Sequence, residues 1–151
     1  MKQSIGWIGF ILILMSFQTA PTKTTNTTKP AVSTPSTTLQ LSLGRGKIVY
    51  LQQCLACHQV NGGGVPHLNA PLDGASAVQG KDKAKLIRIV LKGMTDRIEI
   101  DGEEYSNNMA AHTELTDQQI ADVLTYVRKS WTNKASAVTP AEVKAERSKL
   151  K

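Results

Sequence analysis

Three residues within a five-residue stretch, Cys54 to His58, have side chains that could do chemistry. The stretch reads CLACH, and it holds the only two cysteines of the 151-residue chain, followed directly by one of its three histidines. Thiolate and imidazole groups bind metals, and thiols form covalent bonds. Such a cluster has four plausible uses: a disulfide, a thiol–disulfide redox pair, a zinc site and the covalent attachment of a haem.

The first three uses fit the residues poorly. A disulfide between Cys54 and Cys57 would close a very small loop, so it would remove little chain entropy, and it leaves His58 without a role. A thioredoxin-like redox pair is expected beside a βαβ unit, whereas the flanking residues here have helical patterns. For zinc, Cys57 and His58 are adjacent and cannot easily both face one small tetrahedral centre, and the chain has no second cysteine pair.

Covalent haem attachment accounts for all three residues. C-x-x-C-H is the attachment signature of c-type haem, in which the two thiols add to the two vinyl groups of the porphyrin. On one helical turn, Cys54 and Cys57 face the same edge of the macrocycle. His58 then lies beneath the iron and supplies an axial nitrogen. The sequence therefore predicts one haem c, with its iron bound by His58.

The second axial ligand has to come from elsewhere in the chain. Met109 lies in the polar loop YSNNMAAH, where an apolar side chain among asparagines has no evident packing role. His112 shares this loop and is the main rival, Met94 is a second candidate whose alternative role is core packing, and an open position is the remaining alternative. We expect Met109 to be the ligand. His67 is close in sequence to His58, and we expect it on the surface.

Three helical patterns surround these residues and predict an all-α domain with long irregular connections. The first pattern covers 44–56 and leads into the cysteines, and the second covers 82–92 and is followed by a glycine that stops it. In the third, Thr116 is a good N-cap, Gln119 completes a capping-box pattern, and an apolar stripe then runs as far as Trp131.

The connections between the helical patterns are rich in turn-forming residues. Ile98-Glu99-Ile100, directly before Asp101-Gly102, could form a short strand or hairpin arm. Connections this long in so small a domain need something to wrap around. A haem would serve, because its apolar plate and covalent bonds supply the core that a domain of roughly 90 residues lacks.

Composition divides the chain into four segments. Residues 1–20 contain one lysine, a short apolar run and a small residue at the end, which is the pattern of a signal peptide or, if it is retained, an N-terminal anchor. Residues 21–41 are mostly Thr, Ser, Pro and Lys and predict a disordered linker. Residues 42–133 form the predicted domain, and 134–151 form a C-terminal extension. We expect an exported or periplasmic protein, soluble or tethered to the membrane by its N-terminus.

The charge of the chain constrains its partners only weakly. The formal net charge is +6, which suits an acidic partner surface or solubility alone. The sequence shows no basic helix interleaved with aromatic residues, and export is hard to reconcile with nucleic-acid binding. We therefore expect protein partners and no nucleic acid.

Residues 43–133 resemble a class I cytochrome c. The resemblance rests on GRGKIVYLQQCLACHQVNGGGVP, PLDG, YSNNM and LTDQQIADVLTYVRKSW, in this order and spacing. It implies helices and long loops wrapped around one covalently bound haem. The end of the chain, VTPAEVKAERSKL, is also similar to the end of cytochrome c domains associated with bacterial copper nitrite reductases. No cupredoxin domain is visible in the chain, so it cannot itself reduce nitrite by that copper chemistry.

The resemblance implies roles for single residues. Cys54, Cys57 and His58 match the haem-binding positions of the family. Pro71 matches the proline whose carbonyl accepts a hydrogen bond from the second N–H of the proximal histidine. Met109 matches the distal methionine, although the proline that often follows it is replaced by alanine here, which could loosen the loop.

The resemblance also implies how the first and last helices meet. Gly46 and Tyr50 match positions on the first helix that pack against the last helix. Tyr126 or Trp131 would then lie opposite them.

These observations predict a single-electron carrier and not an enzyme. It would shuttle electrons between respiratory or denitrification complexes, with an oxidase, a reductase or a nitrite reductase as redox partner. Ligation by histidine and methionine favours a comparatively high potential, because the thioether stabilises ferrous iron. The alternative is a peroxidase-like haem enzyme or a ligand sensor with an open distal site.

Overall fold

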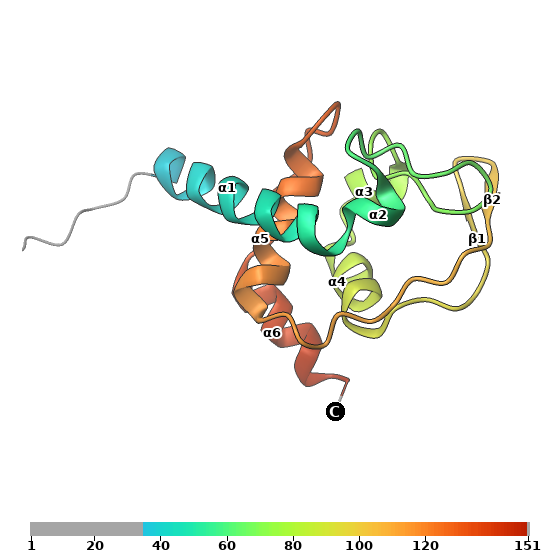
Figure 1. Cartoon of the computed structure of the whole chain (residues 1–151). Helices are drawn as coiled ribbons and strands as arrows, with labels where there is room; N and C mark the ends of the chain where they lie inside the picture. The colour runs from blue at the N-terminus through green and yellow to red at the C-terminus, as the bar shows by residue number, and fades with distance from the viewer. Residues whose placement is uncertain (1–34, 151) are drawn as a thin grey trace, which may run out of the picture. The chain divides into compact units, whose positions relative to one another are not determined.

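Six helices and one short hairpin make up residues 35–150, which the computed structural model describes (Figure 1). The expected helical architecture is found, with one small sheet added to it. The elements are α1 (Pro35–Gln53), α2 (Leu55–His58), α3 (Ser76–Gln79), α4 (Lys83–Lys92), β1 (Ile98–Ile100), β2 (Glu103–Tyr105), α5 (Asp117–Lys129) and α6 (Pro140–Ser148).

Helix α1 begins at Pro35, well before the start at residue 44 that its apolar pattern predicts. The boundary of the predicted linker at residue 41 is therefore wrong, because 35–41 are helical. Proline is tolerated in a first helical turn, where its missing N–H would have no partner. The Ser and Thr residues that follow are polar, so the first turns of α1 show no apolar periodicity and could not be predicted from it. The rest of the predicted linker and the predicted export signal lie outside the described residues.

The helix starts predicted near residues 82 and 116 are confirmed. Asp82 caps α4 by accepting a hydrogen bond from the backbone N–H of Lys85. Thr116 caps α5 because its hydroxyl accepts a hydrogen bond from the backbone N–H of Gln119. The side-chain oxygen of Gln119 accepts one from the backbone N–H of Thr116, so the capping box is complete. Helix α5 stops at Lys129, before the expected end of the apolar stripe, because Ser130 is extended; Trp131 then has a left-handed φ of 53°.

The short hairpin suggested by the alternation at Ile98 to Ile100 is also found. Ile98 pairs with Tyr105 and Ile100 pairs with Glu103 in an antiparallel register. Asp101 and Gly102 form the two-residue turn with φ angles of 54° and 87°, as hairpins with the favoured twist require. Figure 1 shows this hairpin at the far end of the body from the start of α1.

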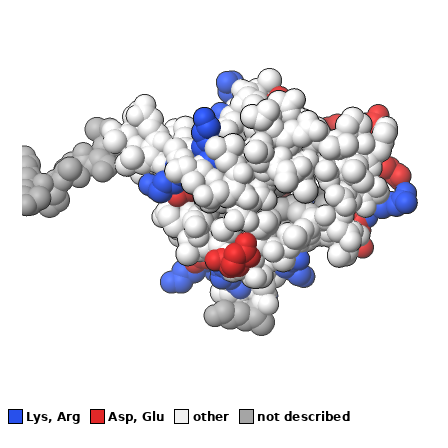
Figure 2. Space-filling view, viewed as in Figure 1, with Lys and Arg blue, Asp and Glu red and all other residues white. Residues whose placement is uncertain are grey.

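The described residues carry a more balanced charge than the whole chain. Four of the 18 basic residues, Lys2, Lys23, Lys29 and Lys151, lie outside 35–150, whereas all 12 acidic residues lie inside. Figure 2 shows a face that is mostly uncharged, with acidic and basic side chains mixed at the hairpin end. Long-range electrostatic steering by this body is therefore weaker than the formal charge of the chain suggests.

Helices α1 and α5 cross closely at Gly46. A Cβ atom at this position would collide with the backbone carbonyl of Asp122 and would lie 2.8 Å from the Cβ of Tyr126. The Asp122 side chain is itself buried and accepts hydrogen bonds from Arg45 Nε at 2.6 Å and Ser42 Oγ at 2.6 Å. The crossing thus combines backbone contact with a buried, fully partnered carboxylate.

Three aromatic rings extend this crossing, as the family resemblance implied. The ring of Tyr50 lies 5.5 Å from that of Tyr126 and 5.5 Å from that of Trp131, and the last two are 5.9 Å apart. These separations are typical of favourable tilted and edge-to-face pairs. The Tyr50 hydroxyl donates to the carbonyl of Gln59, and Trp131 Nε1 donates to the carbonyl of Val60. The aromatic cluster therefore holds the chain that follows the CLACH motif.

The hydrophobic core lies between α1, α4, α5 and the end of the chain. Its buried members are Val49, Tyr50, Ala75, Val78, Ile87, Val90, Leu91, Ile100, Leu115, Ile120, Ala121, Val123, Leu124, Val127, Val138 and Val143.

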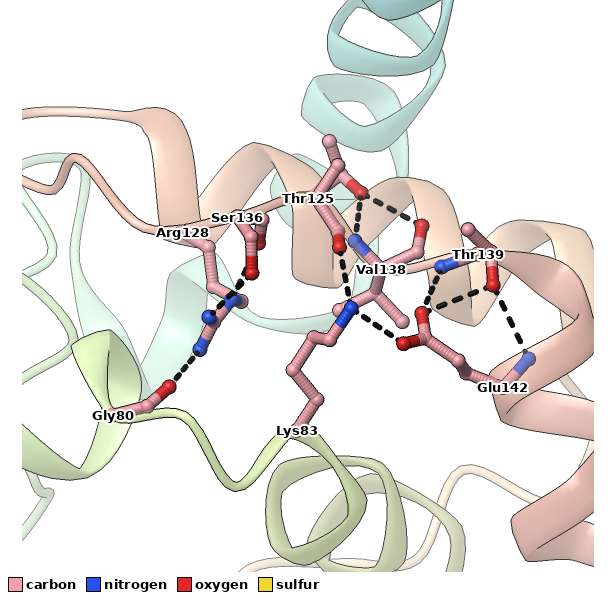
Figure 3. Close-up of polar contacts among 9 residues, drawn as sticks. Gly80, Lys83, Thr125, Arg128, Ser136, Val138, Thr139 and Glu142 are labelled. Atoms are coloured by element: carbon pink, nitrogen blue, oxygen red, sulfur yellow. Dashed lines mark hydrogen bonds and ion pairs between the residues drawn. The ribbon is translucent and has the colours of Figure 1, made fainter.

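The last two residues of this set belong to the C-terminal strap, which we define as residues 134–150. The strap packs on the domain and shares its hydrophobic core. The predicted domain boundary at residue 133 therefore does not separate two packing units. The fully buried Arg128 joins it to the chain before α4, donating to the carbonyls of Ser136, Val78 and Gly80 (Figure 3). These three hydrogen bonds satisfy carbonyls of the strap and of the segment before α4, and they tie the two segments together.

Further polar contacts hold the strap along its length. The Thr125 hydroxyl donates to the carbonyl of Val138 and accepts from its N–H, and Lys83 forms an ion pair with Glu142 (Figure 3). Helix α6 starts with a second capping box, from Thr139 to Glu142, with Pro140 in its first turn. The T-x-x-E spacing and the proline were the sequence signals for this helix, which the apolar pattern did not reveal.

The strap should make the folded state sensitive to acid through Glu146. Its carboxylate, 7% exposed, lies 2.6 Å from Lys149 Nζ and 2.8 Å from Arg88 Nη1. The hydrogen bonds from Lys149 and Arg88 lower the pKa of Glu146 below its usual value of 4.5. A lowered folded-state pKa gives stability that is complete above the unfolded-state pKa and is lost as the pH falls through the folded-state pKa.

We therefore expect Glu146→Gln to flatten the fall in the free energy of unfolding between neutral pH and strong acid. Urea unfolding at a series of pH values measures this slope. Glu99→Gln is the matched control, since Glu99 is an exposed carboxylate on the hairpin, and it should leave the slope close to that of the wild type. Equal slopes for Glu146→Gln and the wild type would show that the strap ion pairs do not contribute.

Candidate functional site

The CLACH motif sits at the junction between α1 and α2. Helix α1 ends at Gln53, Cys54 interrupts it, and α2 carries Cys57 and His58. The backbone N–H groups of Cys57 and His58 both donate to the carbonyl of Cys54, at 3.2 and 2.9 Å. The three residues therefore occupy one helical turn, as the sequence predicts.

These three residues line one large cavity. It holds about 1540 Å³ of space free of protein atoms, counted out to its open mouth. Most of its wall is aliphatic and comes from α3, α4, α5 and the hairpin, and the sulfur-containing and polar residues face it at a few points. The wall is formed by Gln53, Cys54, Cys57, His58, Asn69, Ala70, Pro71, Leu72, Ala77, Val78, Lys85, Leu86, Ile89, Val90, Met94, Ile98, Ile100, Tyr105, Asn107, Asn108, Met109, Ala110, His112, Leu115, Val123, Leu124 and Val127.

A hydrogen bond fixes the ring of His58. Its Nδ1 lies 2.9 Å from the carbonyl oxygen of Ala70. A carbonyl can only accept, so Nδ1 carries the proton and the lone pair of Nε2 stays free to bind a metal. This arrangement is the one that metal-binding histidines usually have.

The acceptor of this bond differs from the expected one. The family resemblance pointed to the carbonyl of Pro71, whereas the structure places the carbonyl of Ala70, one residue earlier, on His58. Pro71 still lines the cavity. Proline holds the preceding residue in an extended conformation, so Pro71 can orient the Ala70 carbonyl without providing the acceptor itself.

Burial favours the uncharged forms of His58 and Cys54. It lowers the pKa of His58, and the hydrogen bond to Ala70 opposes this effect in part. Burial, with a smaller effect of Cys57, raises the pKa of Cys54 to about 11. The neutral imidazole is the form that binds metals, and a neutral, half-buried thiol is a poor free nucleophile.

Met109 lies on the wall of the same cavity, and its backbone is tightly held. It exchanges two hydrogen bonds with Met94, at 2.9 and 2.8 Å. Gly93, with a φ of 69°, packs so closely on this segment that a Cβ there would lie 2.7 Å from the backbone nitrogen of Ala111. The expected loosening of this loop by the missing proline is thus countered by the bridge to Met94.

A second set of contacts holds the other side of the Met109 loop. The N–H of Asn107 donates to the carbonyl of Leu68, and its side chain donates to Asn69 Oδ1 at 2.6 Å. These bonds tie the loop to Leu68 and Asn69. The next residue is Ala70, whose carbonyl holds the ring of His58. One network of backbone and amide contacts therefore positions both Met109 and His58.

The structure brings a second methionine to the cavity. Met94 lines it as well and is half-buried. Met94 and Met109 are fifteen positions apart in the sequence, and no periodicity connects them, so their pairing is a property of the tertiary fold. Met94 is a candidate ligand by residue type alone, and no pattern in the sequence predicts that it pairs with Met109.

The two other histidines lie in different surroundings. His112 lines the cavity, its side chain is 15% exposed, and its Nδ1 lies 3.3 Å from Glu114 Oε1. It therefore remains close enough to be a rival of Met109. The side chain of His67 is 75% exposed and lies 3.5 Å from Glu103, which confirms the expected surface position.

The competing uses of the motif gain no support from the geometry. Both cysteines are free thiols. Within residues 35–150, no group of three or more His, Cys, Asp or Glu side chains is arranged to hold a metal ion.

The residues of the cavity fit a haem c. A flat apolar group can lie against the aliphatic wall, two thiols face it from one helical turn, and His58 presents a free ring nitrogen. Thioethers from Met94 and Met109 and the imidazole of His112 offer a second axial donor. Among the Lys and Arg residues of the described chain, Lys85 alone lines the cavity.

The structure also bears on membrane attachment. None of the helices between residues 35 and 150 has the length and apolar character needed to cross a bilayer.

Comparison with known proteins identifies the family. The sequence model of the Cytochrome c family matches residues 43–131, which include the CLACH motif and the Met109 loop. Cytochrome c-552 of Thermus thermophilus is 32% identical over 133 residues, which cover 74% of this chain and 89% of the relative.

Two further relatives are subunits of larger proteins. The cytochrome c subunit of a quinone-type alcohol dehydrogenase from Gluconacetobacter polyoxogenes is 32% identical over 123 residues, and that of gluconate 2-dehydrogenase from Pantoea cypripedii is 38% identical over 102. The matches cover 72% and 64% of this chain but only 25% and 22% of those subunits.

The helical fold, the cavity behind a C-x-x-C-H motif and the family match all agree with the expectation of a class I cytochrome c fold. The cofactor is haem c with its iron, and the function is electron transfer and not enzymatic catalysis. The chain is therefore a member of the cytochrome c family.

Proposed function

We propose that this chain is a monohaem electron carrier in which Cys54 and Cys57 attach the porphyrin and His58 and Met109 bind its iron. One observation carries the proposal: a single aliphatic cavity is lined by both thiols, by His58 and by Met109. The haem supplies an iron that alternates between the ferrous and ferric states. The residues of the chain attach it, orient it and keep water from it.

His58 and Ala70 set the proximal side in this proposal. The bond from Nδ1 to the Ala70 carbonyl, at 2.9 Å, fixes the ring plane and makes Nε2 a better donor. Because the carbonyl belongs to the backbone before Pro71, the orientation of His58 does not depend on a mobile side chain. Pro71 thus acts through Ala70.

Met109 is the distal ligand that the contacts support best. Its backbone is held by Met94 on one side, and the adjacent loop is held by Leu68 and Asn69 on the other. His112 lines the same cavity, and its Nδ1 contact with Glu114 at 3.3 Å leaves Nε2 free, so the spectra of the variants described below have to separate it from Met109. A thioether raises the potential relative to a second imidazole, which suits an electron carrier in a respiratory or denitrification chain.

The tightly held loop also argues against the alternative of a peroxidase-like enzyme or ligand sensor. Such a site needs an open iron position and space for a small ligand. Two thioethers and one imidazole line this cavity, so three side chains compete for the position that a ligand would take.

The partners that we propose are redox proteins with which the domain exchanges electrons at the exposed side of the motif. Cys57 and Gln53 are exposed there. The relatives named as dehydrogenase subunits make a dehydrogenase one candidate partner, and an oxidase or a nitrite reductase is another. We propose that residues 1–20 export the chain to the periplasm, as a cleaved signal or as a retained membrane anchor, since haem is attached to c-type cytochromes outside the cytoplasm.

The ligand assignment makes a prediction for Met94→Leu. The haem-loaded wild type should show the weak sulfur–iron absorption band of the ferric state at the red end of the visible spectrum. Leucine keeps the volume of Met94 without its sulfur, so the band and the midpoint potential should stay unchanged. Loss of the band in Met94→Leu would move the ligand assignment from Met109 to Met94.

The carrier function itself is tested by a reductive titration of the same wild-type sample. We expect reversible uptake of one electron per chain and fast exchange with an external one-electron donor. Turnover of hydrogen peroxide at a rate comparable to electron exchange would favour the peroxidase-like alternative.

A further inference from the structure

Met94 and Met109 form a directly opposed antiparallel pair. The N–H of Met94 donates to the carbonyl of Met109 at 2.9 Å, and the N–H of Met109 donates to the carbonyl of Met94 at 2.8 Å. Residues that exchange both bonds in this way project their side chains to the same side of the ladder, with Cα atoms about 5.5 Å apart. The two thioethers therefore leave the bridge on the same side.

The cavity lies on that side. Both methionines belong to its wall, together with Cys54, Cys57 and His58. Core packing does not account for Met94. It is half-buried, and it is not among the half-buried residues that pack on the core cluster, whereas Met109 is. Met94 therefore borders the cavity and is not part of the core cluster.

The bridge would survive the loss of either side chain. Its hydrogen bonds involve only backbone atoms, and Gly93 packs against the backbone of residues 109–111. A change at Met109 therefore leaves the backbone of Met94 in place. Methionine has three rotatable side-chain bonds and adapts readily to a new gap, so the sulfur of Met94 can move into space that a smaller residue at position 109 leaves.

We infer that Met94 is a reserve axial ligand, which binds the haem iron when Met109 is absent or dissociated. The inference rests on the proposed function, in which Met109 is the resident ligand. It assigns to Met94 a role that spacing alone does not suggest. Its consequence is that loss of the Met109–iron bond does not open the iron to small molecules, because a second thioether takes the position.

His112 is the competitor that the test must separate from Met94. It lines the same cavity and is largely buried. An imidazole on the iron gives no sulfur–iron band and a lower potential. The band therefore reports which type of side chain has replaced Met109.

The test compares four haem-loaded proteins: the wild type, Met94→Leu, Met109→Ala and the double variant. We expect the ferric sulfur–iron band in the first three and its loss in the double variant. Carbon monoxide should bind readily to the reduced iron only in the double variant. Met109→Leu, which keeps the side-chain volume, replaces Met109→Ala if alanine lowers haem retention, and circular dichroism checks that each variant is folded.

The outcomes separate this inference from the proposed function. Loss of the band in Met109→Ala, with carbon monoxide binding as strong as in the double variant, overturns the reserve role and leaves Met109 as the resident ligand. Loss of the band in Met94→Leu alone overturns the assignment of Met109. A band that persists in the double variant, or is absent from the wild type, overturns both.

Discussion

Replacing both Cys54 and Cys57 with Ser should abolish covalent haem attachment. The chain has no other cysteines, so no thiol remains to form a bond to the porphyrin. Haem staining after denaturing electrophoresis measures the attachment, because only covalently bound haem stays with the unfolded chain. We expect full staining for the wild type, reduced staining for either single variant and none for the double variant.

The same double variant should also be poorly folded. The cavity behind the motif is large and mostly aliphatic, and a small domain that leaves such a surface in water loses a main part of its core. Near-ultraviolet circular dichroism and urea unfolding report this loss. A double variant that stains for haem would contradict the attachment through Cys54 and Cys57, and one with wild-type stability would show that the haem is not a structural element of the core.

Gly46→Ala should destabilise the haem-loaded protein by about 1–3 kcal/mol, the usual cost of inserting a group into a packed region. In the present structure its Cβ would collide with the backbone carbonyl of Asp122, and backbone atoms cannot rotate away. Helices α1 and α5 would have to separate, which also disturbs Tyr50 and the buried Asp122. Urea unfolding followed by circular dichroism measures the difference.

Gly44→Ala is the matched control for this prediction. Gly44 lies on the same helix and is exposed, and no atom lies within 4 Å of a Cβ built there. Alanine is the better helix former by about 1 kcal/mol, so this variant should be slightly more stable than the wild type. If both variants are stabilised, the crossing of α1 and α5 is looser than the structure indicates.

Local signals in the sequence were enough to predict several elements and the kind of site. Thr116 and Gln119 define the start of α5 because a capping box needs only residues three positions apart. Asp101-Gly102 defines the hairpin turn in the same way. Cys54, Cys57 and His58 are placed on one turn by helix geometry alone, so the cavity-facing motif did not need a structure.

Other features follow from contacts between distant segments, and no local pattern contains them. The polar first turns of α1 and the strap helix α6 have weak apolar periods, and α6 owes its place to packing and to partners such as Arg88 and Lys83. The carbonyl that orients His58 belongs to Ala70 and not to Pro71, because the path of the loop, and not the identity of a side chain, decides which carbonyl is near.

The sequence by itself determined the chemistry of this protein, since a thiol pair and a histidine at fixed spacing specify haem attachment through covalent geometry within one helical turn. Only the tertiary structure decided what surrounds that group. The bridge between Met94 and Met109 joins residues fifteen positions apart through backbone hydrogen bonds, which any residue type except proline can make. Side-chain identity therefore does not predict such a pairing. Only the folded chain shows that a second thioether lines the cavity.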